Sequence, residues 1–419
     1  MKLEFGFGTG VQEVIVNDSN VMDVLHANEI EISLQGEEEV RRALQHPIGA
    51  SFLREVVHPG ETIAIVTSDI TRPLPSYLVL PPILEELEKA GVAKKDITIV
   101  FGLGSHRNHT PAEIEKLVGK DIAATLRCED SNSEDCINLG ITANGTQVDV
   151  SRAVATANRR ICLGNIEYHY FAGYSGGAKA IMPGVSNRAA IQSNHRLMVL
   201  GEARAGSIDT NPLRQDIEEA GRICGIDYIV NVVLDEHKKI IKAVAGDSVL
   251  AHREGCKFLD KLYRKEIPER ADIVLVSQGG APKDMNLYQT QKALDNAKHA
   301  VKEGGIVILI GSCKEGLGEE IFEEWMTGSP SPAHMIERIG KDFQLGGHKA
   351  AAIAMVLEKA KIFLVSDLPA DFIKEIFLEP KSSAQEALQD AFKELGEEAT
   401  VLAMPFGGST LPYVVNEVA

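Results

Sequence analysis

Short apolar runs alternate with amphipathic stretches along this chain, a pattern typical of α/β proteins. In the first half, the β-branched runs at 62–68 and 97–101 predict two buried strands. The segment 76–90 between them predicts a helix that ends at Gly91. The tetrapeptide TPAE at 110–113 predicts the start of another helix, because it combines a capping box with proline at the first helical position.

The second half repeats this alternation. The predicted strands lie at 272–277, 306–310, 361–366 and 400–404. The predicted helices lie at 285–303, within 333–357 with a break near residues 346–347, and after the cap at Ser383. Strands that alternate with helices favour parallel or mixed sheets with helical crossovers. The sequence therefore predicts an α/β fold.

A chain of 419 residues is too long for one ordinary core, so we expect two α/β domains. The charged segment 263–271 contains a proline and precedes a predicted strand, which is typical of a domain boundary. We place an N-terminal domain at 1–267 and a C-terminal domain at 268–419. An active-site cleft is expected between them.

Charge and composition exclude several classes of partner. The formal net charge of −17 disfavours nucleic acid and anionic membranes as partners. The first residues lack a basic segment followed by an apolar run, and no apolar run is long enough to cross a membrane. The six cysteines form no CxxC pair, which favours reduced thiols. We expect a cytoplasmic protein.

Two glycine-rich segments resemble phosphate-binding loops without completing either motif. The segment 102–107 begins like a dinucleotide fingerprint, but Arg107 stands in place of the third glycine. The segment 173–179 ends on Lys179, but alanines flank this lysine where a Walker loop requires glycine and then serine or threonine. Such a loop can still expose backbone N–H groups to a ligand, and a plain tight turn is the alternative.

Other candidates for chemistry are three histidines and two groups of polar residues. His106, His169 and His195 lie in segments rich in small and polar residues, and imidazole suits both proton transfer and metal binding. Taken alone, each histidine favours a hydrogen-bonded structural or surface role over a role in chemistry. Arg72 follows a predicted strand and could grip a carboxylate with two hydrogen bonds, alone or while paired with Asp69.

The second polar group lies in the predicted helix at 285–303. Tyr288, Gln289 and Lys292 share one face of that helix, because residues three and four apart are neighbours. A phenol, an amide and an ammonium together could hold a small hydroxy acid. A solvated helix face is the alternative.

Together these motifs resemble the nickel-pincer lactate racemase family. They occur in the family's order: Asp69-Ile-Thr-Arg72-Pro, Gly-Leu-Gly-Ser-His106-Arg107, the block from His169 through Lys179 to Gly184, Asn194-His195, and Tyr288-Gln289-x-x-Lys292. The block from His169 to His195 is long and specific, and the chance of matching all the motifs by coincidence is small.

The resemblance implies a cofactor, the nickel-pincer nucleotide pyridinium-3-thioamide-5-thiocarboxylic acid mononucleotide with bound nickel. It implies that Lys179 carries this group covalently and that His195 is a nickel ligand. Residues next to the cofactor, and near its phosphate, would be Gly173, Ser175, Gly176 and Gly177. Enzymes that make the cofactor would be partners of this chain.

The resemblance also assigns roles around the substrate. His106 and His169 would be the two acid/base groups, one for each face. The substrate-binding residues would be Arg72, Tyr288, Gln289 and Lys292, and Asp69 would orient Arg72 or a neighbouring histidine.

The predicted function is therefore a racemase or epimerase that inverts C2 of a small 2-hydroxy acid by reversible hydride transfer. The substrate would be lactate or a more polar 2-hydroxy acid. A polar substrate is favoured if His348 lines the cleft, and the alternative is that His348 belongs to a polar turn between helices. The alternative is an NAD-dependent 2-hydroxyacid oxidoreductase, which Arg107 disfavours because it interrupts the fingerprint.

Overall fold

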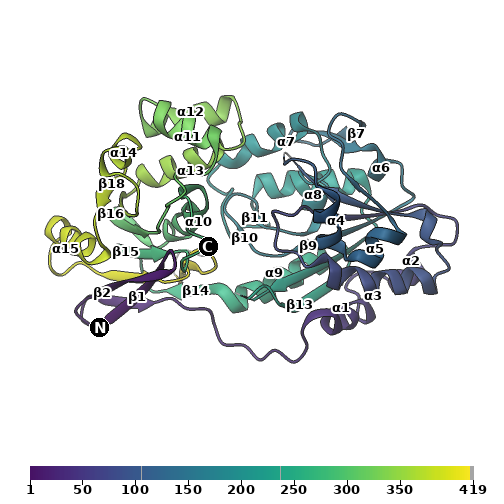
Figure 1. Cartoon of the computed structure of the whole chain (residues 1–419), viewed down its shortest axis with the longest axis horizontal. Coiled ribbons are helices and arrows are strands. Elements are labelled where there is room, and N and C mark those ends of the chain that lie inside the picture. Colours follow the sequence, from purple (N-terminus) through teal and green to yellow (C-terminus); the bar gives the residue numbers. More distant parts are fainter. Residues whose placement is uncertain (105, 236, 416–419) are drawn as a thin grey trace. The chain divides into compact units, whose positions relative to one another are not determined.

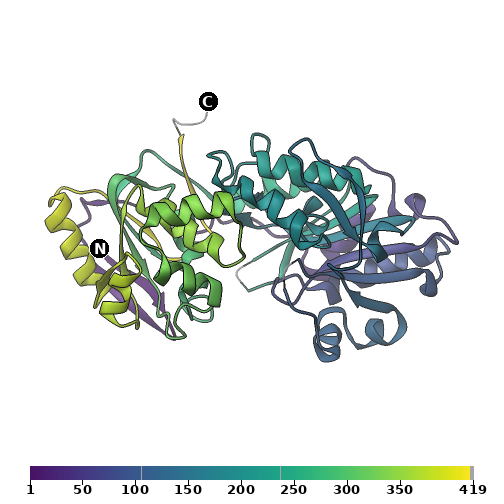
Figure 2. The ribbon, with the colours of Figure 1, turned by 90° about the horizontal axis from the view of Figure 1, so that it is seen from above.

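The computed structural model describes residues 1–104, 106–235 and 237–415. The chain forms two compact units, whose elements are labelled in Figure 1 and shown from above in Figure 2. Unit 1 combines Met1–Glu29 with Leu262–Ala419, and unit 2 is Ile30–Lys261. Each unit contains its own six-stranded sheet. The α/β fold predicted from the sequence is confirmed.

The sheet of unit 2 is mixed. Its strands run parallel except at one edge, where the last two are antiparallel. The strand order is β13 (Ile240–Gly246), β12 (Tyr228–Leu234), β9 (Arg159–Asn165), β4 (Ile63–Ser68), β5 (Ile97–Gly102) and β6 (Arg127–Asp130). The chain winds outward from β4 in one direction and from β9 in the other, so a topological switch point lies between these two neighbouring strands.

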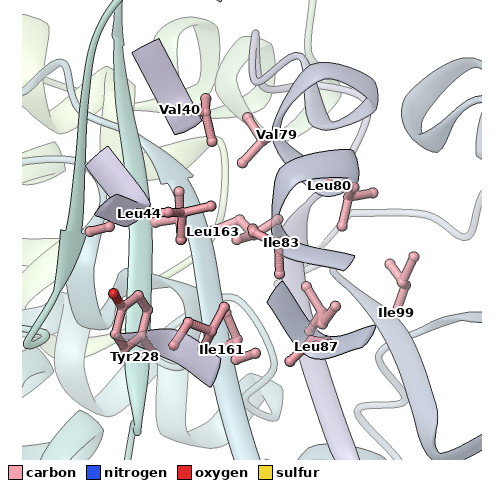
Figure 3. Packing of buried hydrophobic residues seen from close by; sticks show 14 of the residues in the cluster. Val40, Leu44, Val79, Leu80, Ile83, Leu87, Ile99, Ile161, Leu163 and Tyr228 are labelled. Atoms are coloured by element: carbon pink, nitrogen blue, oxygen red, sulfur yellow. The ribbon is translucent and has the colours of Figure 1, made fainter. Parts of the chain in front are cut away.

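Two helices cover one face of this sheet and close the main core of unit 2 (Figure 3). Val40 and Leu44 come from α1 (Gly36–Gln45), and Ile83 comes from α3 (Ser76–Lys89). These side chains pack with strand residues such as Ile161 and Tyr228, and all five are at most 3% exposed. Burial of this apolar surface holds the strands, and therefore the loops that follow them, in place.

The remaining elements of unit 2 are short or lie outside the central sheet. The helices are α2 (Leu53–Val56), α4 (Pro111–Val118), α5 (Lys120–Thr125), α6 (Arg152–Ala155), α7 (Arg188–His195), α8 (Pro212–Cys224) and α9 (Leu250–Tyr263). The 3₁₀ turns are η1 (Lys94–Asp96), η2 (Gly177–Ala180) and η3 (Arg196–Val199). Two antiparallel pairs complete the unit, β7 (Cys136–Ile141) with β8 (Gln147–Ser151) and β10 (Tyr168–His169) with β11 (Gly173–Tyr174).

The sheet of unit 1 is entirely parallel. Its order is β18 (Glu379–Lys381), β17 (Lys361–Val365), β16 (Val301–Ile310), β15 (Ala271–Ser277), β19 (Val401–Met404) and β3 (Val21–Val24). The helices are α10 (Leu287–Ala297), α11 (Glu320–Gly328), α12 (Pro332–Lys341), α13 (Gly347–Leu357), α14 (Ala370–Glu375) and α15 (Ala384–Leu395). The pairs β1 (Lys2–Phe7) with β2 (Gly10–Ile15) and β14 (Arg264–Ile267) with β20 (Leu411–Val414) complete it.

The observed units divide the chain differently from the expected domains 1–267 and 268–419. The first 29 residues belong with the C-terminal half, because β3 pairs with β19 at one edge of the sheet of unit 1. This parallel pairing joins residues that lie far apart in the sequence. Local sequence patterns carry no signal for it.

Most of the predicted elements are present. The capping box at Thr110 is formed at the start of α4, and Ser383 caps α15. The helix predicted at 285–303 was too long, because α10 ends at Ala297 and the chain from Val301 onward forms β16. Val301 pairs with Ala271 across an irregular register, and Gly304 adopts φ +77°. Among the described residues, no helix is long and apolar enough to cross a membrane.

Candidate active site

The candidate residues of unit 2 follow three adjacent strands. Asp69 comes directly after β4, His106 follows β5, and His169 follows β9 within β10. These strands are parallel neighbours, so their carboxyl ends share one edge of the sheet. Ligands of open α/β sheets bind at such an edge, beside the switch point. Ser105, in the loop after β5, lies outside the described residues.

Asp69 and His106 form a hydrogen-bonded pair at this edge. The Nδ1–H of His106 donates to Oδ2 of Asp69 at 2.6 Å, and Oγ1 of Thr71 donates to the same carboxylate at 2.9 Å. Burial raises the pKa of Asp69, but hydrogen bonds from His106 and Thr71 and the positive charge of Arg72 outweigh it and lower that pKa overall. The ionised carboxylate thus fixes the proton of His106 on Nδ1.

The outer nitrogen of His106 remains available for proton exchange. The side chain is 36% exposed, and its Nε2 has no partner among the described residues. Asp69 was expected to orient Arg72 or a neighbouring histidine, and the structure places His106 in direct contact with it. Arg72 is exposed, and its side chain makes no hydrogen bond or ion pair to any residue of the described chain. Its guanidinium can therefore receive a carboxylate.

The glycine-rich loop at 173–177 has a backbone conformation and close contacts that residues with a Cβ atom could not adopt. Gly173, Gly176 and Gly177 have φ values of +76°, +80° and +59°. A Cβ atom on Gly173 would lie 1.8 Å from the carbonyl oxygen of Ser207, and one on Gly177 would lie 2.7 Å from Nη2 of Arg214. These positions need glycine for both conformation and space.

Several hydrogen-bond donors along this loop lack acceptors. The backbone N–H groups of Gly176 and Ala178 have no acceptor within the described chain. The Oδ1 of Asn231 accepts from the N–H of Gly177 at 2.6 Å, whereas its buried Nδ2 atom has no partner. Buried donors without partners are costly, so this loop fits an acceptor-rich ligand such as an anion.

Lys179 follows this loop in η2 and has a strongly perturbed amine. The side chain is half-buried, and its Nζ makes no hydrogen bond to any described residue. Burial lowers the pKa of Lys179 well below its ordinary value, and the charges of Arg72 and Arg214 lower it further against Glu167. A larger fraction of the amine is therefore neutral and nucleophilic near neutral pH.

The rings of His169 and His195 both contact Phe171. The ring centroid of Phe171 lies 4.5 Å from that of His169 and 4.9 Å from that of His195, both in edge-on geometry. The N–H of Ala172 donates to Nδ1 of His169 at 3.3 Å, so the neutral ring carries its proton on Nε2. The structure thus brings these two histidines around one aromatic side chain.

A buried chain of hydrogen bonds orients His195. Nδ2 of Asn194 donates to Oδ2 of Asp216 at 2.8 Å, which leaves Oδ1 of Asn194 facing His195. The Nδ1–H of His195 donates to that oxygen at 3.0 Å, so the lone pair of the neutral ring is on Nε2. Metal-binding histidines are commonly oriented in this way. His195 is only 8% exposed.

The candidate residues of unit 1 lie on α10 and are supported by α13. Tyr288 and Gln289 are half-buried near the start of α10, and Lys292 is exposed one turn later. The Nζ of Lys349 donates to the carbonyl oxygen of Tyr288 at 2.6 Å and lies 3.8 Å from the centroid of its ring. Lys349 therefore fixes the backbone and the ring of Tyr288 together.

His348 is the other candidate in α13. It is 6% exposed, and its Nδ1 accepts a hydrogen bond from the N–H of Gly346 at 3.0 Å. Burial and the neighbouring charge of Lys349 lower the pKa of His348 to about 3. The ring is therefore neutral and helps to shape the turn before α13.

Comparison with known proteins identifies the family. The lactate racemase N-terminal domain matches residues 7–207, and the lactate racemase C-terminal domain matches residues 267–411. The lactate racemase of Thermoanaerobacterium thermosaccharolyticum is 31% identical over 421 residues, which cover 98% of each chain. The chain belongs to the lactate racemase family. The lactate racemase of Lactiplantibacillus plantarum is also 31% identical, over 89% of this chain and 90% of that protein.

Solved structures agree with this membership of the lactate racemase family. The lactate racemase apoprotein of Thermoanaerobacterium thermosaccharolyticum superposes with a TM-score of 0.91 at 30% identity, over 98% of this chain and 100% of that chain. A Thermotoga maritima protein shares the fold at a TM-score of 0.66 and 17% identity. The chain is therefore an isomerase of the racemase type, as the sequence predicted.

Sequence reasoning missed the buried partners of the candidate residues. Asp216, Arg214, Asn231, His252 and Lys349 had no assigned role. One signal was present, since Asn211-Pro212 marks a helix start that places Arg214 and Glu218 four residues apart on one face. Nothing in the sequence shows that this face is buried.

Proposed function

We propose that this chain inverts C2 of lactate or a closely related 2-hydroxy acid, with a nickel-pincer nucleotide attached to Lys179. One observation carries the proposal. The amine of Lys179 is half-buried and has no hydrogen-bond partner among the described residues, and it directly follows a loop in which the N–H groups of Gly176 and Ala178 also lack acceptors there. A reactive amine next to such a loop suits covalent attachment of an anionic group.

The residues present fit that nucleotide. Unused N–H groups at Gly176 and Ala178 suit its phosphate, and the positive φ values of Gly173, Gly176 and Gly177 allow the loop conformation that carries them. His195, with its lone pair on Nε2, suits a metal ligand. Among the described residues there is no cluster of three or more His, Cys, Asp or Glu side chains that could hold a metal. His195 would act as a single ligand from the chain.

The nucleotide would supply an acceptor and donor of hydride at C2 of the substrate. The chain would then manage the proton of the substrate hydroxyl. The Nε2 of His106 would accept that proton from one face while Asp69 stabilises the imidazolium that forms. His169 would return a proton to the ketone oxygen when C2 is approached from the opposite face. Inversion requires two such groups, because either enantiomer must be accepted.

Other side chains would hold the substrate while its centre is planar. Arg72 would receive the carboxylate with two hydrogen bonds, since its guanidinium has no partner among the described residues. Tyr288, Gln289 and Lys292 would provide further polar contacts from α10. A fixed carboxylate lets the ketone present either face without losing the substrate.

An NAD-dependent oxidoreductase, the alternative from sequence, gains no support. In the dinucleotide fingerprint the glycines lead directly from the strand into a helix. Here β5 ends at Gly102 and α4 begins only at Pro111. The loop between them instead carries His106, which is paired with Asp69.

The test uses protein produced together with its cofactor-maturation enzymes and loaded with nickel. We expect added mass on the peptide that contains Lys179, and racemisation of lactate or of one member of a panel of 2-hydroxy acids. In deuterium oxide the hydrogen at C2 should be retained, because it moves as hydride. An unmodified Lys179 in active enzyme, or extensive deuterium at C2, would contradict the proposal.

A further inference from the structure

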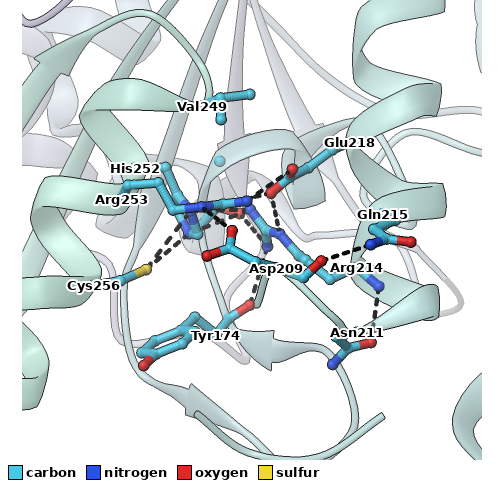
Figure 4. A network of polar contacts seen from close by, with 12 residues as sticks. Tyr174, Asp209, Asn211, Arg214, Gln215, Glu218, Val249, His252, Arg253 and Cys256 are labelled. Carbon is cyan, nitrogen blue, oxygen red and sulfur yellow. Dashed lines mark hydrogen bonds and ion pairs between the residues drawn. The ribbon is translucent and has the colours of Figure 1, made fainter. Parts of the chain in front are cut away.

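A buried cationic cluster lies behind the glycine-rich loop and includes groups to which we have assigned no chemistry (Figure 4). Its centre is Arg214 of α8, which is fully buried, as is His252 of α9. Nη1 of Arg214 donates to the carbonyl oxygens of Tyr174 at 3.2 Å and Gly176 at 3.3 Å. Nε2 of His252 donates to the carbonyl oxygen of Ser175 at 2.7 Å. Three consecutive carbonyls of the loop are therefore held from one side.

The protonation state of His252 follows from its partners. A carbonyl oxygen can only accept, so Nε2 carries a proton toward Ser175. A guanidinium can only donate, so Nδ1, which lies 3.1 Å from Nη2 of Arg214, carries the lone pair. Burial and the charge of Arg214 lower the pKa of His252 well below its ordinary value. His252 is therefore a neutral bridge between Arg214 and the loop.

A shared carboxylate balances the charge of the cluster on the side away from the loop. Nε of Arg214 donates to Oε1 of Glu218 at 2.8 Å, and Nη1 of Arg253 donates to the same oxygen at 2.7 Å. Arg253 also reaches the exposed Asp209 but has no hydrogen bond to the glycine-rich loop among those of the described chain. Of the two arginines, only Arg214 donates to the loop backbone within the described part of the chain, and it does so through Nη1. This difference makes Arg253 a matched control.

We propose that Arg214 and His252 are positioning residues for Lys179, because they anchor the glycine-rich loop through its carbonyls and leave the N–H groups of Gly176 and Ala178 unused. The inference rests on the proposed role of Lys179 as the attachment point. It extends that role, since neither residue belongs to the motifs that pointed to the family. Gly221 of α8 packs directly against Ala178, where a Cβ would come within 2.6 Å, so α8 also fixes the start of η2.

The same anchor sets the electrostatic environment of Lys179. The charged and titratable groups that act on its amine are Arg72 after β4, Arg214 on α8, Glu167 after β9 and His252 on α9. Arg214 cannot lose its proton, so its charge persists at every pH at which the protein is folded. Arg214 therefore both anchors the loop and supplies a positive charge. The substitutions Arg214→Gln and Arg214→Lys can separate these two effects.

The experiment measures the reactivity of Lys179 in the full-length protein made without the maturation enzymes. Competitive acetylation with acetic anhydride between about pH 6 and about pH 10 gives the labelling midpoint of each lysine by mass spectrometry. In Arg214→Gln we expect the midpoint of Lys179 to rise. One pH unit of rise would mean about a tenfold smaller fraction of free amine at neutral pH. Arg214→Lys should restore the original midpoint, because it keeps the charge.

Hydrogen exchange of the peptide that covers residues 173–179 reports the anchoring separately. Arg214→Lys and His252→Leu should speed exchange there, because each removes donors to the loop carbonyls. His252→Leu changes no charge in the cluster, so it provides a second measurement if Arg214→Gln, which takes a cation from Glu218, does not fold. Arg253→Gln should change neither the labelling midpoint nor exchange in the loop.

Two results would overturn the proposal. One is loop exchange that is unchanged in both Arg214→Lys and His252→Leu. The other is a Lys179 midpoint that Arg214→Gln does not move, or that Arg253→Gln moves equally. Neither measurement involves racemisation or nickel. Failure of the proposed function would appear separately, as matured enzyme without added mass on Lys179.

Discussion

The two units place their candidate residues at similar positions but hold them in different ways. In unit 2 they follow β4, β5 and β9, beside the switch point between β4 and β9. In unit 1 the strand order also reverses, between β15 and β19, and α10 follows β15. Both sheets thus offer the edge at which α/β proteins bind ligands.

The difference lies in the partners of these residues. In unit 2, buried groups fix protonation states, as Asp69 does for His106 and Asn194 for His195. In unit 1, a single helix presents three polar side chains, and Lys349 supports Tyr288 through its backbone oxygen and its ring. Histidines with a fixed protonation state suit proton transfer, whereas the polar helix face of unit 1 suits recognition of a substrate. The comparison predicts losses of turnover from changes in unit 2 and losses of affinity from changes in unit 1.

The largest effect is expected from Lys179→Ala. Racemisation should fall to background, because the proposed attachment point is lost. The free energy of unfolding of the unloaded protein should fall by less than about 1 kcal/mol, since the amine has no hydrogen-bond partner among the described residues. Chiral chromatography and chemical denaturation measure the two quantities. Lys257→Ala, at an exposed site on α9, is the control and should keep full activity. Residual racemisation in matured Lys179→Ala would contradict the prediction that changes in unit 2 abolish turnover.

The next largest effect is expected from His106→Gln. Loss of the proposed general acid/base should reduce turnover by about 10²–10⁴-fold. The two enantiomers have equal free energy in solution, so kcat/KM must fall by the same factor in both directions. Asp69→Asn should cause a smaller loss, because His106 remains but the carboxylate that fixes its tautomer is gone. Initial rates from each pure enantiomer test this, and a pure rise in KM with unchanged kcat would contradict it.

Local signals predicted much of the fold. The β-branched runs predicted as strands form β4, β5 and β15. The predicted caps at Thr110 and Ser383 begin α4 and α15. Each signal depends on neighbours in sequence. The pairing of β3 with β19 joins residues about 380 positions apart, and the end of α10 depends on the pairing of β16, so sequence patterns missed both.

The candidate site shows the same limit. Residues at strand ends and in the glycine-rich loop were recognised because their types and order resemble a family. The residues behind them were not, because Arg214 and Asp216 look like ordinary polar positions on an amphipathic helix. Both are fully buried, and burial depends on tertiary packing rather than on local sequence. Polar residues buried in this way need partners, and here those partners are the loop and Asn194.

A moderate effect is expected from Lys349→Met in unit 1. Methionine keeps most of the volume but removes both the hydrogen bond to the oxygen of Tyr288 and the cation–π contact. We expect KM to rise by about tenfold, the equivalent of about 1.4 kcal/mol, with kcat changed much less. Steady-state kinetics measures the division, and Lys341→Met on the exposed end of α12 is the control. A fall in kcat as large as that of His106→Gln would break the comparison between the units.

The smallest effect concerns a buried carboxylate in unit 1, Asp295. Burial raises the pKa of Asp295 above its ordinary value, although Lys298 and a hydrogen bond from Gln291 oppose this. A raised folded pKa means that the native state binds the proton more tightly, so stability falls as pH rises from the unfolded pKa toward the folded one. Removing the charge should remove this loss. In addition, Oε1 of Gln291 is buried without a partner and could accept from a new amide at position 295 after its own amide turns over.

We therefore expect Asp295→Asn to stabilise the protein by about 1 kcal/mol at neutral pH and by less near pH 4. Asp216 in unit 2 is the matched contrast, because Thr142, Thr146 and Asn194 all donate to it. An amide at position 216 would point a donor at other donors, so Asp216→Asn should destabilise the protein by about 2 kcal/mol. Urea unfolding across this pH range measures both variants. The prediction would be contradicted if the free energy of unfolding changed in the same direction in both variants. Hydrogen-bond satisfaction would then not explain how the two buried carboxylates affect stability.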